Sequence, residues 1–408
     1  MMSVIALLFS FMLVCLGHGL LNTMLSVRAA MESFSSLSVG IIGFCYFAGF
    51  IFGVSLCTRL ISVVGHIRAF AALGSLTSAL SIAFLLSINL PSWMILRFTY
   101  GVCIAALYMV IESWLNSLST NGNRAQVLSI YMVLIYLSFS VSQLLLNIGS
   151  LGSFHQFVIV SMLFSVSIVP LCISSKAKPI EIASEPINFK KLVKHIPYGS
   201  ISCLCGGMVV GSMWTMLGAF LEFKKFSTGH ISLFIAMTFM GALIFQFPLG
   251  KLSDIANNRR STIKFASLVG SFVFFLTFLI ITYSNNTLSL SLLFLLMGGF
   301  SYPIYSLSLA HIIDHLDSKH IVSASGSLIL INAIGSMLGS LICSAMMILT
   351  SVNAFLWFGG IILSLNFAAS YLFKPKTSHA NSETNFIALP RTTMALNSLD
   401  PRIPTETE

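Results

Sequence analysis

Two charged side chains lie inside one strongly apolar stretch, and they are the first candidates for chemistry. The segment LRFTYGVCIAALYMVIESWLN (96–116) carries Arg97 near its start and Glu112 near its end. Successive helical residues turn by about 100°, which places Arg97, Gly101, Tyr108 and Glu112 on one narrow stripe. Because a charge in hydrocarbon is costly, we expect this stripe to face a bundle interior or a water-filled cavity.

Arg97 and Glu112 are predicted to belong to two different sites. The distance along the helix between their positions is roughly 22 Å, so the two side chains cannot pair. Arg97 would hold an anionic group or modulate a nearby proton site, and Glu112 would act at a gate and as a second titrating group. Two alternatives stay open: Arg97 could snorkel to the membrane interface, and Glu112 could pair with Arg68 or Arg124.

Other polar and aromatic residues recur at helical spacing on neighbouring apolar segments. Histidine titrates near neutral pH and tyrosine supplies hydrogen bonds, so both suit a substrate or proton path. The predicted path residues are His18, Asn22, Arg97, Tyr108, Trp214, Tyr302 and Tyr305. His18 could instead be a hydrogen-bonded core residue, and Trp214 and Tyr302 could be interfacial anchors.

A further set of polar residues is predicted to lie where two halves of the molecule meet. Such stripes of small and polar side chains are more often helix packing than ligand binding, and that alternative stays open. The predicted interface residues are Gln143, Asn147, Gln246, Asn332 and Ser336.

The composition places this chemistry in a membrane. Of 408 residues, 56% are hydrophobic and only 8% are charged, whereas a soluble chain carries about a quarter charged residues. The net charge of +9 is spread over short loops and does not indicate nucleic-acid binding. The eight cysteines lie in or beside apolar runs, so we expect neither a disulfide framework nor a metal site.

Twelve apolar runs are long enough to span a bilayer, which needs about 20 residues each. The N-terminal run could be mistaken for a signal peptide, but no Lys or Arg precedes it and it continues to Val27, which favours a first membrane helix. The runs are 4–27, 38–58, 68–88, 92–112, 127–147, 154–174, 197–220, 229–250, 263–283, 288–310, 323–348 and 352–373.

A lysine-containing polar segment after the sixth run divides the chain into two halves. We predict a six-helix bundle over 1–174, a cytoplasmic linker over 175–196, a second bundle over 197–375 and a disordered cytoplasmic tail over 376–408. With both termini in the cytoplasm, fifteen Lys and Arg residues fall in the inner loops or directly after the last run, and three fall in the outer loops. The positive-inside rule therefore predicts this orientation.

Matching positions in the two halves carry matching residues, which favours an internal duplication of the kind many transporters have. Gly101 and Tyr108 of the fourth run have the same spacing as Gly298 and Tyr305 of the tenth. The second and eighth runs both end in a glycine followed by a basic loop.

These residues resemble those of a known family. GKLSDIANNRR (250–260) and LRFTYGVCIAA (96–106) resemble the loop and fourth-helix signatures of the major facilitator superfamily. ESWLN (112–116), followed by Arg124 and SIY (129–131), is similar to its bacterial YcaD-like branch. The resemblance covers 1–375 and implies two pseudo-symmetric six-helix bundles, with the first, fourth, seventh and tenth helices lining a central path. One departure is Cys57, which stands where the family has an acid in the first-half loop.

The function implied is secondary transport of a small molecule by alternating access, in the bacterial cytoplasmic membrane. We expect proton-coupled efflux of a drug or metabolite, with a monomeric protein, no cofactor and no resident metal. No phosphate-binding Gly-rich loop with Lys-Ser/Thr is present to use ATP. The inner gate would be formed by salt bridges among Arg59, Arg68, Glu112, Arg124, Asp254, Arg259 and Arg260.

Two alternatives are kept. The protein could be an uptake symporter or uniporter for a nutrient or anionic metabolite. It could also be a membrane enzyme or metal-regulated protein that uses His311, Asp314, His315, Asp317 and His320, although a solvated loop is the simpler interpretation.

Overall fold

The computed structural model describes residues 2–118, 124–173, 196–256, 258–284, 286–315 and 321–373. All regular elements within these ranges are helices, as the sequence predicts. Of the predicted linker only residue 196 is described, and the predicted tail lies outside the described residues.

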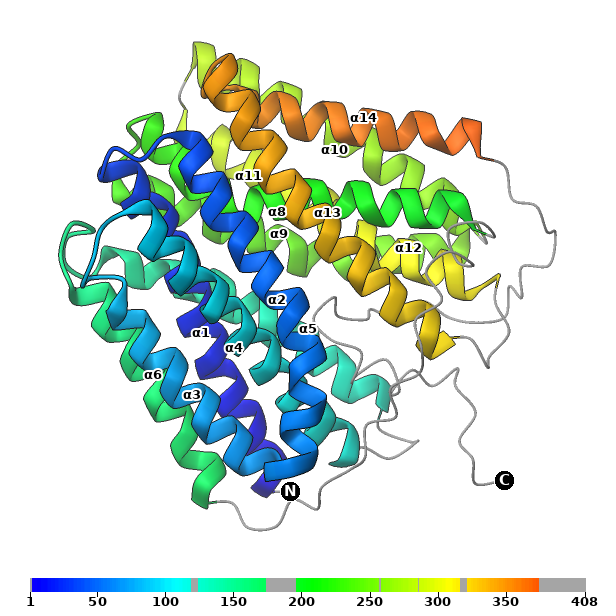
Figure 1. The fold of residues 1–408 in the computed structure, drawn as a ribbon. Helices are drawn as coiled ribbons and strands as arrows, with labels where there is room; N and C mark the ends of the chain where they lie inside the picture. Colours follow the sequence, from blue (N-terminus) through cyan, green and yellow to red (C-terminus); the bar gives the residue numbers. More distant parts are fainter. Residues whose placement is uncertain are drawn as a thin grey trace, which may run out of the picture.

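The first half forms one helical bundle, coloured blue to green in Figure 1. A short 3-10 helix, η1 (Gln143–Asn147), extends the fifth helix. The helices are α1 (Met2–Met31), α2 (Ser36–Val64), α3 (His66–Ala83), α4 (Leu90–Leu118), α5 (Arg124–Ser142) and α6 (His155–Ile173).

The second half forms a matching bundle, coloured green to orange in Figure 1. The predicted span 288–310 is divided here into two helices, because Pro303 has no N–H to donate to the helix. The helices are α8 (Pro197–Phe223), α9 (Thr228–Ile255), α10 (Arg259–Tyr283), α11 (Thr287–Ser301), α12 (Ile304–Ile313), α13 (Ile321–Leu349) and α14 (Ala354–Leu372).

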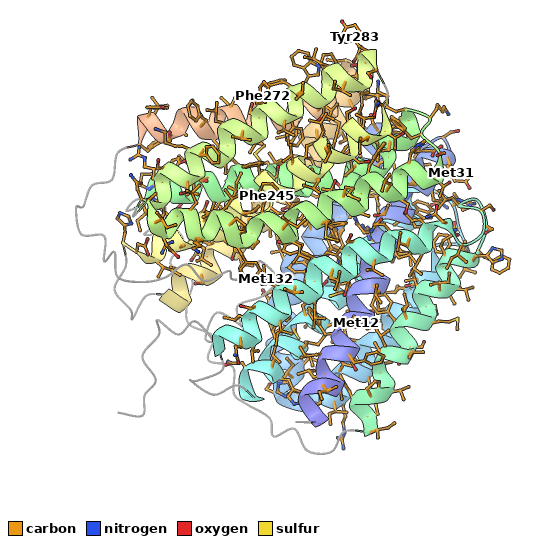
Figure 2. All side chains as sticks on the ribbon, turned by 180° about the vertical axis from the view of Figure 1, so that it is seen from behind. Met12, Met31, Met132, Phe245, Phe272 and Tyr283 are labelled. Carbon is orange, nitrogen blue, oxygen red and sulfur yellow. The ribbon has the colours of Figure 1, made fainter. Side chains whose placement is uncertain are left out.

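Eleven segments of the described chain are long and apolar enough to cross a membrane, with α11 and α12 counted together. The remaining predicted span, 68–88, corresponds to α3, which is shorter and packs against α4 and α6. Burial follows the predicted division into inner and outer helices: 83% of the most apolar window of α8 is buried, against 33% for α6. Phe272 and Tyr283 project from the outer surface of α10 in Figure 2, where lipid would contact them.

Four glycines show that the two bundles repeat one packing unit. A Cβ at Gly49 of α2 would strike the Phe98 carbonyl of α4, and a Cβ at Gly101 of α4 would strike the Tyr46 carbonyl of α2. Only glycine therefore allows these two backbones to lie so close. The same two contacts recur between α9 and α11, with identical spacing: Gly241 against Leu295, and Gly298 against Thr238.

The helix starts repeat in the same register. Ser35 accepts the Ser38 N–H at the start of α2, and Ser227 accepts the His230 N–H at the start of α9. Asn89 likewise accepts the Ser92 N–H at the start of α4, and Asn286 caps α11. Such caps satisfy N–H groups that have no partner within the helix. Both the caps and the glycine contacts indicate a duplicated structural unit.

The two bundles meet at one end of the molecule and diverge toward the other (Figure 1). We call the end formed by the turns 31–36, 147–155, 223–228 and 349–354 the far face, and the end where α1 begins and α2 ends the terminus face. At the far face Ser36 donates to the Ser344 carbonyl at 3.3 Å, and Ser340 donates to the Gly40 carbonyl at 3.1 Å. Direct contacts between α2 and α13 therefore close this end.

Candidate substrate cavity

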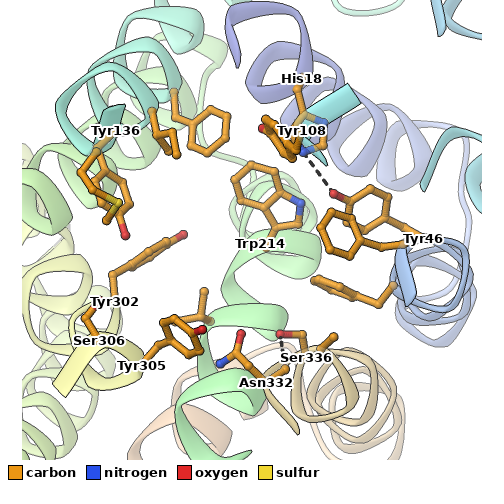
Figure 3. Close-up of a pocket in the computed structure, with 17 residues that line it drawn as sticks. His18, Tyr46, Tyr108, Tyr136, Trp214, Tyr302, Tyr305, Ser306, Asn332 and Ser336 are labelled. Carbon is orange, nitrogen blue, oxygen red and sulfur yellow. Dashed lines mark hydrogen bonds between the residues drawn. The ribbon is translucent and has the colours of Figure 1, made fainter. Parts of the chain in front are cut away.

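A cavity lies between the two bundles at the centre of the structure (Figure 3). It contains about 860 Å³ of space not occupied by protein atoms, including the part that opens to one side. Both bundles contribute to its walls, through residues 18 to 139 of the first and 210 to 336 of the second. The lining residues are His18, Tyr46, Phe47, Phe50, Tyr108, Met132, Ile135, Tyr136, Phe139, Val210, Trp214, Tyr302, Tyr305, Ser306, Asn332, Ala333 and Ser336.

The cavity walls are aromatic and carry hydrogen-bonding groups, with no Asp, Glu, Lys or Arg among the lining residues. Figure 3 shows Trp214 projecting between a His18–Tyr46 side and a Tyr136–Tyr302 side. The rings of Trp214 and His18 lie 5.1 Å apart, and those of Tyr136 and Tyr302 lie 5.8 Å apart. Such walls suit an uncharged planar molecule, which would stack on the rings and bond to the hydroxyl and amide groups.

Trp214 and Tyr302 line this cavity in the middle of the bundle and do not anchor the protein at the interface. The break before Pro303 explains the position of Tyr302, because it turns the chain between α11 and α12. Tyr305 follows at the start of α12, and Tyr108 lines the same cavity from α4. The two tyrosines that the internal repeat relates therefore lie in one shared site.

His18 is a core residue and a cavity residue at once. Only 2% of its surface is exposed, and both ring nitrogens have partners. The Tyr100 hydroxyl lies 3.0 Å from Nδ1, and the Tyr46 hydroxyl lies 3.2 Å from Nε2. These two hydroxyls fix the ring orientation, and either nitrogen can carry the proton of the neutral ring.

Arg97 and Asn22 lie outside the main cavity, in a small neighbouring pocket toward the far face. Arg97 is only 2% exposed, so it does not snorkel to the interface. Its Nη2 donates to Asn22 Oδ1, and Asn22 Nδ2 donates to the Trp214 carbonyl at 2.5 Å. The guanidinium carbon also lies 4.7 Å from the centre of the Tyr46 ring. Asn22 therefore connects Arg97 in one bundle to α8 in the other.

Glu112 is fully buried within the first bundle. The Tyr131 hydroxyl of α5 donates to its carboxylate, and the Tyr131 ring stacks on Phe11 of α1 at 4.4 Å. Arg97 and Glu112 thus point to the same side of α4, as the helical stripe predicts, while Ile95 on the opposite side is 68% exposed.

Two of the predicted inner-gate residues, Asp254 and Arg259, pair with each other on the second bundle. Arg259 pairs with Asp254 and, at 2.9 Å, with Asp314, and all three belong to the second bundle. Arg260 donates to the Ser370 carbonyl of α14 and covers the Tyr198 ring. Arg59 and Arg68 are exposed, and the side chain of Arg124 lies outside the described residues. The ion pairs of Arg259 and the hydrogen bond of Arg260 thus stay within the second bundle, at the end where the two bundles diverge.

Two of the predicted interface residues, Gln143 and Asn147, take part in hydrogen bonds between the halves. Asn147 donates to Ser232 of α9 at 3.1 Å, and Ser232 in turn donates to the Gln143 carbonyl at 2.6 Å. The other three residues hydrogen-bond within the second bundle, although Asn332 and Ser336 also line the cavity that lies between the bundles. These bonds are Gln246 to Ser306, Asn332 to the Cys203 carbonyl and Ser336 to the Gly207 carbonyl.

Sequence reasoning missed several aromatic residues that shape the site. Tyr46 and Tyr100 hold His18 and cover Arg97, and Phe139 lies 5.0 Å from Trp214. A tyrosine in an apolar helix resembles an ordinary core residue, so composition gave no signal for these positions. Tyr136 did carry one, since it shares a helical stripe with Ser140 and Gln143.

The histidine cluster considered as a metal site is only partly described. His311 is buried, its ring lies 4.8 Å from that of His315, and Asp314 is bonded to Arg259. Asp317 and His320 lie outside the described residues. Within the described part of the chain, no group of three or more potential metal ligands comes together.

Two duplicated helical bundles, closed against each other at one end around a shared cavity, define an integral membrane protein of the transporter type. The comparisons agree. The family model for the Major Facilitator Superfamily matches residues 7–263 and 199–398. The chain therefore belongs to the major facilitator superfamily.

Curated relatives place the chain in the YcaD-like branch. The uncharacterized transporter YcaD of Escherichia fergusonii is 26% identical over 341 residues, covering 82% of this chain and 86% of the relative. A transporter of the same superfamily from Yersinia pestis is 25% identical over 349 residues, covering 84% and 88%.

Solved structures agree on the fold. The nucleoside transporter NupG has a TM-score of 0.75 at 15% identity, over 92% of this chain and 100% of that one. The human organic anion transporter MFSD10 has a TM-score of 0.60 at 12% identity, over 90% and 99%. At these identities the likeness concerns the fold alone.

Proposed function

We propose that this protein is a secondary active transporter that moves a small molecule across the bacterial cytoplasmic membrane by alternating access. The observation that carries the proposal is the central cavity, which both bundles line and which hydrogen bonds between α2 and α13 close at the far face. When the two bundles rock against each other, a site between them can open to one side of the membrane and then to the other.

The distribution of Lys and Arg residues indicates which face of the protein is cytoplasmic. Fifteen Lys and Arg residues lie in or beside the loops on the side of the termini and three lie in the loops on the other side, which favours a cytoplasmic terminus face. The structure then corresponds to the inward-facing state. In the outward-facing state the terminus-face ends would approach, and the predicted gate around Arg59, Arg68 and Arg259 would form.

The substrate that the walls support best is an uncharged or weakly polar planar drug or metabolite, and we propose that it is exported. Phe139, Trp214 and Tyr302 offer stacking faces, while Asn332 and Ser306 offer hydrogen bonds. One observation favours the second candidate, uptake of an anionic metabolite: the buried positive charge of Arg97 lies just beyond the cavity.

We further propose proton coupling through His18 or Glu112. Both are buried titratable groups in the first bundle, and His18 lies on the cavity wall. Protonation of His18 would change its hydrogen bonds to Tyr46 and Tyr100 and so alter the cavity wall.

The test is flux of candidate compounds in proteoliposomes, with and without a pH gradient. Compounds would first be selected by thermal shift of the purified protein. We expect transport that depends on the gradient and is lost in His18→Ala or Glu112→Gln. Transport that ignores the gradient would exclude proton coupling, and absence of any transmembrane flux for tightly bound compounds would exclude the transporter function itself.

A further inference from the structure

Arg97 is a buried cation whose charge the described structure leaves largely unbalanced. The guanidinium is always protonated in proteins, and this one is 2% exposed. Its Nη2 donates to Asn22, and the rings of Tyr46 and Tyr100 lie 4.7 and 5.6 Å from its carbon. Within the described residues, Nε and Nη1 have no hydrogen-bond partner.

The other buried arginines of the described chain, Arg28 and Arg259, each have a carboxylate partner. Arg28 pairs at 2.5 Å with Glu32, which lies in the turn directly after α1. Arg259 pairs with Asp254 and Asp314. Ring faces and one amide oxygen replace only part of the hydration that a guanidinium loses on burial, so Arg97 lacks the compensation that these two have.

A small pocket lies beside Arg97, at the seam between the bundles. Asn22 and Ser26 of α1 and Gly43 of α2 line it from the first bundle, and Thr215 lines it from α8 of the second. It has no lining residue in common with the main cavity. Its free space admits about one particle the size of a water molecule.

We infer that this pocket binds one small monovalent inorganic anion, such as chloride, against the Arg97 guanidinium. The charge selects an anion, and the two free guanidinium nitrogens supply donors for it. The size of the pocket selects a monatomic ion over a carboxylate. A substrate carboxylate held in the main cavity is separated from Arg97 by Asn22 and Trp214.

The site is complete only while the far face is closed. Thr215 belongs to the second bundle, and Asn22 is held in place partly by its bond to the Trp214 carbonyl of that bundle. Separation of the bundles at the far face removes this wall. The anion therefore binds the closed far face better than the open one and shifts the equilibrium toward the closed state.

The experiment measures anion-dependent thermal unfolding of the purified full-length protein. Sodium chloride is titrated into sodium gluconate at constant ionic strength, because gluconate is too large for the pocket. We expect the Tm to rise by about 2 °C or more along a saturable curve, with bromide acting like chloride. Arg97→Gln should abolish this response.

Arg28→Gln is the matched control. It also removes one buried positive charge near the far face, but from a side chain that already has a carboxylate partner. This variant should keep the chloride response of the wild type. An equal response in the wild type and Arg97→Gln, or the same loss in Arg28→Gln, would overturn the inference.

A second measurement needs no variant and so does not depend on the folding of Arg97→Gln. Crystals of the wild type in the closed far-face state, grown or soaked in bromide, should show anomalous density between Arg97 and Thr215. Density for water alone at saturating bromide, or an empty pocket, would overturn the inference. Acetate should not displace the bromide, whereas displacement would assign the site to carboxylates instead. Neither experiment requires transport, so the result is independent of the proposed function.

Discussion

Asn22 offers the sharpest test of how the two bundles are held together at the far face. It accepts a hydrogen bond from Arg97 of its own bundle and donates one to the Trp214 carbonyl of the other. Asn22→Leu keeps the side-chain size and removes both bonds. We expect this variant to destabilise the far-face-closed state relative to the open state.

The magnitude follows from which of the two bonds crosses between the bundles. The bond to Arg97 is charge-assisted and stronger, about 1.5–3 kcal/mol, but it lies within one bundle and is retained when the bundles separate. This bond therefore contributes equally to the closed and open states and does not change their ratio. The bond to Trp214 is lost on opening and contributes about 1 kcal/mol, which corresponds to roughly a 5-fold change in the ratio of closed to open molecules.

The assay is the distance between spin labels on two exposed far-face turns. Ser33 and Ser351 suit this purpose because they are exposed and belong to opposite bundles, and the exposed Cys172 would first be changed to Ser. Pulsed electron resonance then reports the closed and open populations directly. In Asn22→Leu the long-distance fraction should grow about 5-fold relative to the closed fraction.

Asn366→Leu is the control for general loss of stability. Asn366 is also fully buried, but it donates to Ser202 and Ser267 within the second bundle. This variant should unfold at a lower temperature and leave the distance distribution unchanged. The reasoning fails if Asn22→Leu leaves the distances unaltered, or if Asn366→Leu alters them equally.

Three further predictions test the role of Arg97, the packing of the helices and the ion pairs of the second bundle. Arg97→Ala should abolish transport while circular dichroism and monodispersity stay normal, and normal flux would remove Arg97 from the mechanism. Gly101→Ala and Gly298→Ala should lower thermal stability by similar amounts, about 1–3 kcal/mol each, because each Cβ meets a backbone carbonyl that cannot move aside; unequal effects would argue against equivalent packing. Arg259→Gln should cost about 1–2 kcal/mol of stability without changing the far-face distances, since its ion pairs stay within one bundle.

The face of each helix could be predicted because helical periodicity and the penalty for charge in lipid act locally. Arg97 and Glu112 are buried on one side of α4, and Ile95 and Phe98 are exposed on the other. The same argument separates the apolar α6 from the inner helices. These predictions need only the sequence of one helix at a time.

Five of the seven predicted path residues line the cavity, but the exclusion of Asn22 and Arg97 from it could not be predicted, because that depends on helix tilt and on what stands in between. Asn22 and Trp214 separate Arg97 from the main cavity, and no pattern within α4 contains that information. Gln246 shows the same limit. The sequence predicts a position between the halves, but its side chain donates to Ser306 of α12 in its own half, beyond the helix break at Pro303.

The duplication explains why the packing of the helices was more predictable than the chemistry of the site. The glycine contacts relate position 101 to position 298, which makes Phe294 the counterpart of Arg97. Phe294 is fully buried and stacks on Phe234 at 5.0 Å, so the second bundle fills with an apolar ring the place that holds a cation in the first. Tyr108 and its counterpart Tyr305 both line the cavity. The repeat therefore preserves the helix packing and the aromatic wall, whereas the buried charge of Arg97 belongs to the first half and has no counterpart at the equivalent position of the second.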